Sequence, residues 1–343
     1  MQAGAAIVWG CLFASTLAFG ITEKWNPFLS KSVKSIGNMI LSPNLDFDGS
    51  YSLHLGAIDL HQEPGTPVYS VRRGIPSLPK GRKGDSELGG WTTTVQVLSD
   101  DGILTYFMHL DPDSISLSLR EHIERKEPIE AGTKLGVLYK HQTLDSHVHF
   151  GAADCQRHLR LNPQSFLDYK DTERPRILSI LLSEGGDNQL VDLPGTVSGE
   201  VELTLLAFDT VDGMKKKYPV NRVDLEIFSW EREVYSATVF DATAMPANEP
   251  LDNRCEFLTD YDGYSPALGD TLYRHPRERL PAFPIALTAK KESVPDHLKT
   301  WFNPFPGPWK TYLYPNGFYT VIATVFDAKG NSTSFLRVLK IQN

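Results

Sequence analysis

The sequence is poor in cysteine. It contains three cysteines among 343 residues, and Cys155 and Cys255 are far apart. Metal sites built from thiolates need cysteines in close pairs, so two distant cysteines indicate neither such a site nor a disulfide framework. We expect Cys155 to be a small buried or free thiol rather than a nucleophile, because catalysis by cysteine needs a partner that forms the thiolate. Whether Cys155 and Cys255 pair is open.

A basic excess is also missing. The chain has 34 Lys and Arg against 42 Asp and Glu, a net charge of −8. Nucleic-acid binders carry the opposite balance, so we expect no nucleic-acid partner. No G-x-S-x-G elbow, phosphate loop, C-x-x-C or H-E-x-x-H is present, which excludes the sites that depend on those motifs. Hydrophobic residues make up 41% and charged residues 22% of the chain, which is typical of a soluble globular protein.

The first twenty residues carry no charge, and Glu23 and Lys24 follow shortly after them. A short apolar run with small residues near Gly20 predicts a signal peptide over residues 1–20, cleaved after Gly20, and therefore an exported protein: periplasmic, cell-envelope or secreted. Cys11 would leave with this segment. A basic start is missing, so a membrane anchor is the alternative. In the mature chain we expect no membrane span.

The length predicts two domains at about 150 residues each. Short apolar stretches broken by Gly, Pro and Asp predict a mainly β fold, with a first domain over residues 21–182. Its clearest element is a hairpin of Thr93–Leu98 and Ile103–Leu110 around an Asp-Gly turn. Turn-forming residues 183–200 predict a linker. Regularly spaced strands in 201–343 predict an immunoglobulin-like β-sandwich with a long irregular insertion at about 241–310. Further elements are expected at 67–72, 116–124 (a helix), 134–138, 147–152, 201–208, 222–229, 233–240, 317–326 and 334–341.

Four of the ten histidines lie in segments of the first domain whose pattern is typical of β-strands: His54, His109, His147 and His149. In the strand Ser146-His147-Val148-His149-Phe150, alternation places both imidazoles on one face and the two apolar side chains on the other. The same parity puts His109 on the face of Phe107 and Thr105, and we expect it to reach the side of the sheet that carries His147 and His149.

An imidazole and a carboxylate, His54 and Asp59, lie five residues apart near Gly56. Zinc accepts such ligands, and catalytic zinc sites use three of them. This segment and those that follow it resemble, in their order, the lysostaphin-type (LytM-like) zinc metallopeptidases. The matching segments are His54-Leu55-Gly56 with Asp59, Gly65-Thr66-Pro67-Val68, Tyr106-Phe107-Met108-His109-Leu110, Ala131-Gly132-Thr133-Lys134-Leu135-Gly136, His147-Val148-His149-Phe150 and Leu161-Asn162-Pro163.

The resemblance covers residues 48–169. It implies an antiparallel β-sheet with a groove, one Zn²⁺ held by His54, Asp59 and His149, and catalytic imidazoles at His109 and His147. It also implies cleavage of peptide bonds in the stem peptides or cross-bridges of peptidoglycan. Two neutral imidazoles and one carboxylate leave the ion net positive, which suits it to lower the pKa of a bound water. His147 is then the favoured general base and His109 the favoured stabiliser of the tetrahedral intermediate, although these roles could be exchanged.

Two departures from the family pattern affect this interpretation. The family usually places its first His and Asp four residues apart, whereas His54 and Asp59 are five apart, so strict alternation would turn Asp59 away. We therefore expect a β-bulge or tight bend at Gly56-Ala57. The family commonly has Gly-Pro before its last histidine pair, and this chain has Leu144-Asp145-Ser146, which affects the expected substrate preference.

The main alternative is a non-catalytic wall-binding or hydrolase-regulating module that keeps the peptidase fold. A zinc peptidase for protein substrates is a third interpretation, and His61 is a substitute candidate for a metal ligand. Most other histidines are expected to be ordinary core or surface residues. Aromatic residues crowd the Pro-rich stretch of the second domain, where we expect them to cover the core rather than to stack on sugars: Trp301, Phe302, Phe305, Trp309, Tyr312 and Tyr314.

Overall fold

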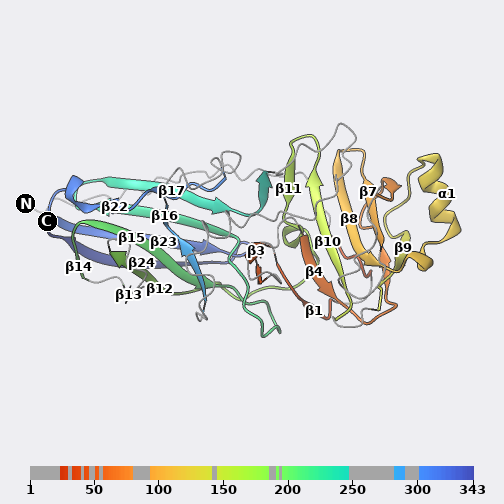
Figure 1. Ribbon diagram of the computed structural model, residues 1–343, viewed down its shortest axis with the longest axis horizontal. Helices are drawn as coiled ribbons and strands as arrows, with labels where there is room; N and C mark the ends of the chain where they lie inside the picture. The colour runs from red at the N-terminus through yellow and green to blue at the C-terminus, as the bar shows by residue number, and fades with distance from the viewer. Residues whose placement is uncertain are drawn as a thin grey trace, which may run out of the picture.

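The chain forms two sets of antiparallel strands that follow one another along the long axis of the molecule (Figure 1). The structure is a computed structural model that describes residues 24–29, 33–39, 42–45, 51–53, 57–79, 93–140, 145–184, 191–192, 195–246, 282–289 and 301–343. The expected mainly β, antiparallel fold is confirmed. The expected signal peptide lies outside the described residues, and among those described no helix is long and apolar enough to cross a membrane.

An eight-stranded sheet makes up most of the first set. The strands of its main path, in spatial order, are β1 (Ser35–Ile36), β4 (Ala57–His61), β10 (His147–Asp154), β8 (Ile103–Leu110), β7 (Thr93–Leu98) and β6 (Ile75–Ser77). The sheet is extended beyond β10 by β11 (Leu159–Leu161) and β18 (Ala244–Pro246). Two small sheets pair β2 (Pro43–Leu45) with β3 (Tyr51–Leu53) and β5 (Pro67–Tyr69) with β9 (Lys134–Val137).

The predicted hairpin forms β7 and β8 with the predicted bounds. Gly102 takes a positive φ of 80° and donates its N–H to the Ser99 carbonyl, which closes the turn. Only glycine adopts this conformation without steric cost. The predicted helix is confirmed as α1 (Leu117–Arg125), whose N-cap is the Ser116 hydroxyl. Two short 3₁₀ helices, η2 (Pro112–Ser114) and η3 (Pro163–Ser165), complete this part.

One face of the eight-stranded sheet is buried in an apolar core. Ile58, Leu60, Val148, Phe150 and Phe107 have no exposed surface and belong to one packed cluster. They come from β4, β10 and β8, the three neighbouring strands at the centre of the sheet. Since side chains alternate along a strand, the residues between these five point to the opposite face.

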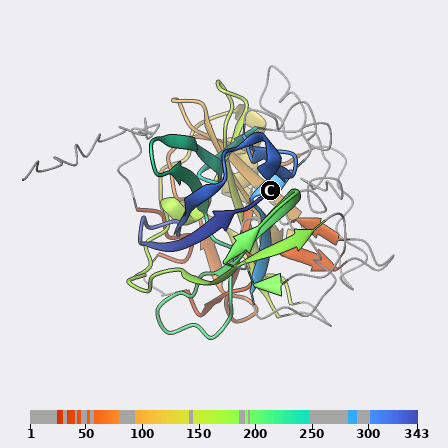
Figure 2. The same ribbon diagram turned by 90° about the vertical axis from the view of Figure 1, so that its left-hand side faces the viewer.

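The second set of strands is a β-sandwich, seen end-on in Figure 2. One five-stranded sheet contains β13 (Val191–Asp192), β12 (Arg176–Glu184), β15 (Glu200–Phe208), β19 (Phe283–Ala286) and β22 (Trp309–Lys310). The other contains β14 (Thr196–Val197), β24 (Ser332–Ile341), β23 (Gly317–Phe326), β16 (Arg222–Ser229) and β17 (Glu233–Asp241). Both sheets contribute to one core, in which Leu203, Leu225, Val321 and Trp309 are fully buried. Shorter elements are β20 (Thr288–Ala289), β21 (Phe305–Pro306) and η6 (Thr311–Leu313).

Sheet pairing assigns β12 and β18 to other parts of the fold than the sequence predicts. β12 begins at Arg176, in the range expected to belong to the first domain, yet it pairs with β15 of the sandwich. We therefore propose a boundary before Arg176 rather than at 183–200. β18 lies in the expected insertion and pairs with β11 of the eight-stranded sheet. The rest of that insertion, over 247–281 and 290–300, lies outside the described residues.

The expectation for Cys155 is wrong, because this cysteine is disulfide-bonded. Its partner lies outside the described residues. Two distant cysteines suggested no framework in the sequence, but folding brings residues together regardless of their separation along the chain. The expected role of the C-terminal aromatics is confirmed for Trp301, Phe302, Phe305 and Trp309, which are buried in the sandwich core. Tyr312 is exposed.

Truncation of Phe150 tests the core beneath the sheet. Phe150 packs against Phe107, with ring centroids 5.1 Å apart and planes inclined by 34°, and is fully buried. We expect Phe150→Ala to lower the free energy of unfolding by about 3–5 kcal/mol, the usual cost of the cavity it leaves. Urea denaturation measures the change. The control is Phe318→Ala on the sandwich surface, where the ring is 64% exposed and a change within about 0.5 kcal/mol is expected. Equal effects would contradict this account.

Candidate functional site

The register between β4 and β10 assembles the first part of the site. His149 lies opposite Asp59 and His147 lies opposite His61. All four side chains are on the face away from the apolar core, because Ile58, Leu60, Val148 and Phe150 occupy the other face. The Asp59 Oδ1 atom is 2.9 Å from His149 Nδ1 and 3.7 Å from His147 Nε2. Asp59, His147 and His149 are each less than 10% exposed.

A β-bulge brings His109 to the same face. The pairing of β7 with β8 passes from Thr93↔Leu110 to Val95↔Phe107, so β8 contains one extra residue between Phe107 and Leu110. His109 has a φ of +64°, the left-handed conformation that non-glycine residues seldom adopt. Its ring centroid lies 4.8 Å from that of His147 and 6.0 Å from that of His149.

The parity expected for His109 is therefore wrong, although its place beside His147 and His149 is as expected. Phe107 faces the core and packs against Phe150, and regular alternation would have turned His109 into that core as well. The extra residue reverses the facing beyond Met108, so that Leu110 points into the core in its turn. The structure reveals the bulge through the positive φ of His109. Residue types alone do not predict this conformation, because histidine seldom adopts it.

The ring of His147 has a defined orientation. Its Nδ1 atom lies 2.9 Å from the Asp145 carbonyl oxygen. A carbonyl only accepts hydrogen bonds, so Nδ1 carries the proton in this contact. In the neutral imidazole, Nε2 then keeps the lone pair, and this atom points toward Asp59. The arrangement suits a residue that takes a proton at Nε2. Asp145 thus takes part through its backbone, a role its side-chain type did not indicate.

His61 lies at the edge of this group. Its ring stacks on that of His147, with centroids 5.3 Å apart and planes inclined by 21°. Burial lowers the pKa of His61, and the neighbouring His147 lowers it further. Gly37 packs against the other side: a Cβ atom there would lie 2.2 Å from His61 Nε2 and 3.1 Å from the Asp59 Cβ. A larger residue at this position would therefore displace the His61 ring from its place beside His147.

Two polar residues that no sequence motif indicated support Asp59. The Asn38 side-chain amide donates to Asp59 Oδ2 at 3.0 Å. Lys216, from the segment that joins β15 to β16 in the sandwich, donates to the Asn38 side-chain oxygen at 3.1 Å and to the Gly37 carbonyl. Burial lowers the pKa of Lys216, and the Asp59 carboxylate opposes that shift. In the sequence, Lys216 is the middle residue of three consecutive lysines, a pattern typical of an exposed surface.

Two of the predicted features fall outside the described residues: His54, the third expected ligand, and Gly56, where the bulge was expected. The other four predicted site residues, Asp59, His109, His147 and His149, are brought together. Ala57, the first residue of β4, pairs regularly with Gly151 of β10.

The donor atoms of Asp59 and His149 fit one Zn²⁺. With Zn–N and Zn–O bonds of about 2.0–2.2 Å, two ligands at a tetrahedral angle lie about 3.4 Å apart. Asp59 Oδ1 and His149 Nδ1 are 2.9 Å apart, a hydrogen-bond distance about 0.5 Å shorter than that value, so a small outward shift of the two side chains would let both atoms bind one ion. A carboxylate oxygen and an imidazole nitrogen are also the donor types that zinc prefers. Asn38, which holds the second oxygen of Asp59, supplies the outer contact that orients such a ligand.

Neither a protein-family model nor a curated protein sequence matches the chain. Solved structures do show partial similarity. A zinc-containing peptidase from Vibrio cholerae has 18% identity over 34% of this chain and 32% of its own length, with a TM-score of 0.26. A family M23 peptidase from Pseudomonas aeruginosa has 20% identity over 37% of this chain and 47% of its own length, with a TM-score of 0.22. Lysostaphin has 15% identity over 55% of this chain and 88% of its own length, with a TM-score of 0.29. The chain thus spans less than half the length of the first two peptidases.

Substitution of His109 tests the bulge. Glycine adopts a positive φ at no steric cost, whereas valine, with its branched Cβ, does not tolerate it. We expect His109→Gly to keep the fold with a free energy of unfolding within about 1 kcal/mol of the wild type, and His109→Val to lose about 1–3 kcal/mol more. Urea denaturation of both variants measures the difference. Equal stability would show that position 109 is in regular strand conformation.

Proposed function

We propose that the chain is a zinc-dependent endopeptidase that hydrolyses peptide bonds in peptidoglycan. The observation that carries the proposal is the convergence of Asp59, His149, His147 and His109 on one buried polar face of the central strands. These four side chains are also the ones to which the ordered lysostaphin-type motifs assign ligand and catalytic roles. Three separate segments of the chain contribute them, so chance placement explains the group poorly.

In this proposal Asp59 and His149 hold the metal together with His54. A bound Zn²⁺ supplies Lewis acidity toward a substrate carbonyl and toward water. His147 accepts a proton at Nε2, because the Asp145 carbonyl keeps its Nδ1 protonated. His109 stabilises, through a ring N–H, the negative charge that develops on the substrate oxygen. Both rings are almost completely buried, so their interactions with substrate would be little screened by water.

The disulfide at Cys155 supports export as part of the proposal. Disulfides persist in oxidising compartments such as the periplasm or the cell exterior, where peptidoglycan is also found. The acidic net charge of −8 opposes a polyanionic substrate and is compatible with peptides. The sandwich contributes Lys216 to the support of Asp59, and we propose that it keeps the site in its active arrangement.

Loss of the proposed general base tests the enzyme. We expect His147→Ala to lower the release of soluble muropeptides from purified peptidoglycan by about 10²–10⁴-fold, the usual contribution of general acid–base catalysis. Chelation of the metal should abolish release. His122→Ala, the same substitution on the distant helix α1, should keep wild-type activity. Equal release by wild type, His147→Ala and chelated protein would contradict the proposal, and the absence of release by all three would leave a non-catalytic wall-binding or regulatory module. Cleavage of a soluble peptide with intact muropeptides would indicate a protein substrate.

Removal of the amide that orients Asp59 tests the metal site independently of turnover. We expect Asn38→Ala to weaken zinc binding by about 10–100-fold, as is usual when an outer contact of a metal ligand is lost. Competition with a chromogenic chelator measures the affinity. Asn316→Ala, in the sandwich near the C-terminus, serves as the matched control and should bind zinc as the wild type does. An unchanged affinity in Asn38→Ala would place Asp59 outside the coordination of the metal.

A further inference from the structure

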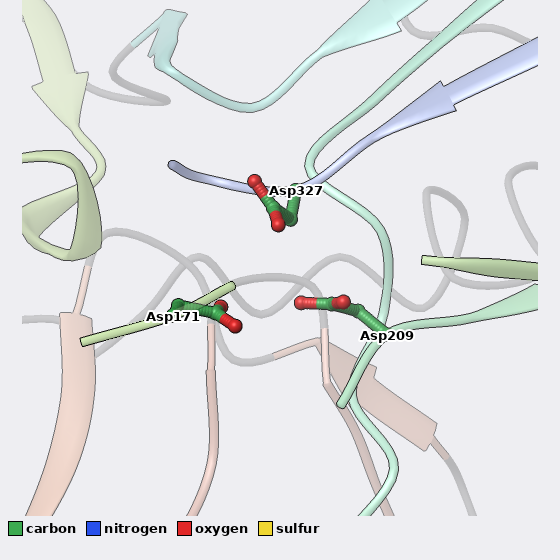
Figure 3. A group of neighbouring side chains, drawn as sticks. All are labelled: Asp171, Asp209 and Asp327. Carbon is green, nitrogen blue, oxygen red and sulfur yellow. The ribbon is translucent and has the colours of Figure 1, made fainter. Parts of the chain in front are cut away.

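A second group of acidic residues lies where the sandwich meets the first part of the chain. Asp171, Asp209 and Asp327 each offer one carboxylate oxygen, and these three atoms lie within 4.8 Å of one another. Figure 3 shows the three carboxylates pointing into one shared space from three different segments. Asp209 and Asp327 are each only 3% exposed, and Asp171 is half-buried.

The backbone around these residues fixes the group firmly. Asp209 follows β15 and exchanges two backbone hydrogen bonds with Tyr218. Asp327 follows β23, and its Oδ1 atom accepts from the backbone N–H groups of Lys329 and Asn331. The Asn331 side chain donates both to Asp327 Oδ2 and to the Asp171 carbonyl. One asparagine therefore joins the segment before β12 to the loop between β23 and β24.

The hydrogen bonds leave part of the group unsatisfied. Asp209 Oδ1 is buried and accepts no hydrogen bond, and the two buried oxygens of Asp171 have no partner of good geometry, since the Glu173 backbone N–H makes only a weak contact with them. A buried carboxylate without a partner is strongly unfavourable, so such groups normally pair with a cation or ligate a metal. Among the described residues, none of the three aspartates forms an ion pair. The neighbouring Lys329 ammonium donates to the Leu167 carbonyl and lies over the Tyr169 ring.

Burial and mutual repulsion raise the pKa values of two of the three carboxyl groups. Burial, followed by the charges of Asp327 and Asp171, raises the pKa of Asp209 to about 8. Burial and the Asp327 charge raise the pKa of Asp171 to about 6. Without a bound cation, Asp171 and Asp209 therefore take up protons at a higher pH than isolated aspartates do.

We propose that Asp171, Asp209 and Asp327 form a Ca²⁺ site that ties the sandwich to the preceding part of the chain. Calcium binds oxygen ligands at about 2.3–2.6 Å, so two ligands of one ion lie at most about 5 Å apart, and the group meets this limit. Its coordination is flexible, whereas Mg²⁺ demands a regular octahedron and usually keeps several waters. An all-oxygen donor set is unlike the nitrogen and sulfur ligands that zinc prefers. The group is also separate from Asp59 and its histidines.

The position of the site gives calcium a structural role. Asp171 lies between η3 and β12, whereas Asp209 and Asp327 belong to the sandwich. An ion shared by all three would hold these segments together. Asp209 also begins the segment that carries Lys216 and Tyr218, which bond to the Gly37 and Ile36 carbonyls next to β4. Calcium would therefore stabilise the junction against which the β1 edge of the eight-stranded sheet packs.

Calorimetric titration of the zinc-loaded full chain with CaCl₂ tests the site directly. We expect one Ca²⁺ per chain, and binding at least tenfold weaker for Mg²⁺. Asp209→Asn should weaken Ca²⁺ binding at least tenfold, whereas Asp113→Asn, an exposed aspartate before α1, should bind as the wild type does. Absence of Ca²⁺ binding by the wild type at millimolar concentration, or equal binding by Asp209→Asn, overturns the proposal.

Thermal unfolding with and without calcium distinguishes the loss of calcium binding from misfolding of the variant. Burial already raises the pKa of Asp209 to about 8, and asparagine is a neutral side chain of the same size, so we expect Asp209→Asn to be folded without calcium and at least as stable as the wild type under that condition. Calcium should raise the melting temperature of the wild type by several degrees and leave that of Asp209→Asn unchanged. An equal shift in both proteins overturns the proposal.

The pH dependence supplies a further measurement of the same group. Because the native pKa values of Asp171 and Asp209 lie above their unfolded values, protonation favours the folded state. The calcium-free wild type should therefore gain stability as the pH falls from 8 to 6. The other titratable groups that face these three aspartates are Tyr169, Glu173, Asp212, Tyr218 and Lys329. Saturating calcium should remove this dependence, and a dependence that survives it contradicts the proposal.

Discussion

The antiparallel register between β4 and β10 is the constraint on which the site depends. It places His149 opposite Asp59 and His147 opposite His61, and it is fixed by the apolar residues between them. Ile58, Leu60, Val148 and Phe150 must all face the core, so a slip of one residue would bury the histidines and expose the apolar set. The same hydrophobic burial that stabilises the sheet therefore selects the polar face on which chemistry can occur.

The polar face is supported from outside the sheet as well. Asn38 holds one oxygen of Asp59, and Lys216 holds Asn38 from the sandwich side. The Tyr218 hydroxyl donates to the Ile36 carbonyl of β1 at 2.7 Å. These contacts make the sandwich a structural partner of the site rather than a distant appendage. Asp209, one of the three aspartates at the junction, lies at the start of the same segment, so the support of Asp59 and the proposed calcium site share this stretch of backbone.

Much of the fold follows from local pattern. The hairpin of β7 and β8, the helix α1 after Ser116 and the long sandwich strands are visible because alternation, turn residues and caps are short-range signals. The site is visible in part, because His147 and His149 alternate with buried apolar residues. The alternation of polar and apolar residues does not predict the left-handed backbone conformation of His109. Lys216 and the aspartates at 171, 209 and 327 come together only through tertiary folding, as does the disulfide partner of Cys155, so the sequence does not reveal their pairing.

Anomalous X-ray scattering at the zinc absorption edge, from crystals grown with Zn²⁺, tests the central claim most directly. The account predicts a single strong peak within bonding distance of Asp59 Oδ1 and His149 Nδ1, with His54 as a further ligand and with the His109 and His147 rings beside the metal but outside its coordination. A peak elsewhere in the chain, or coordination that omits Asp59, would contradict it.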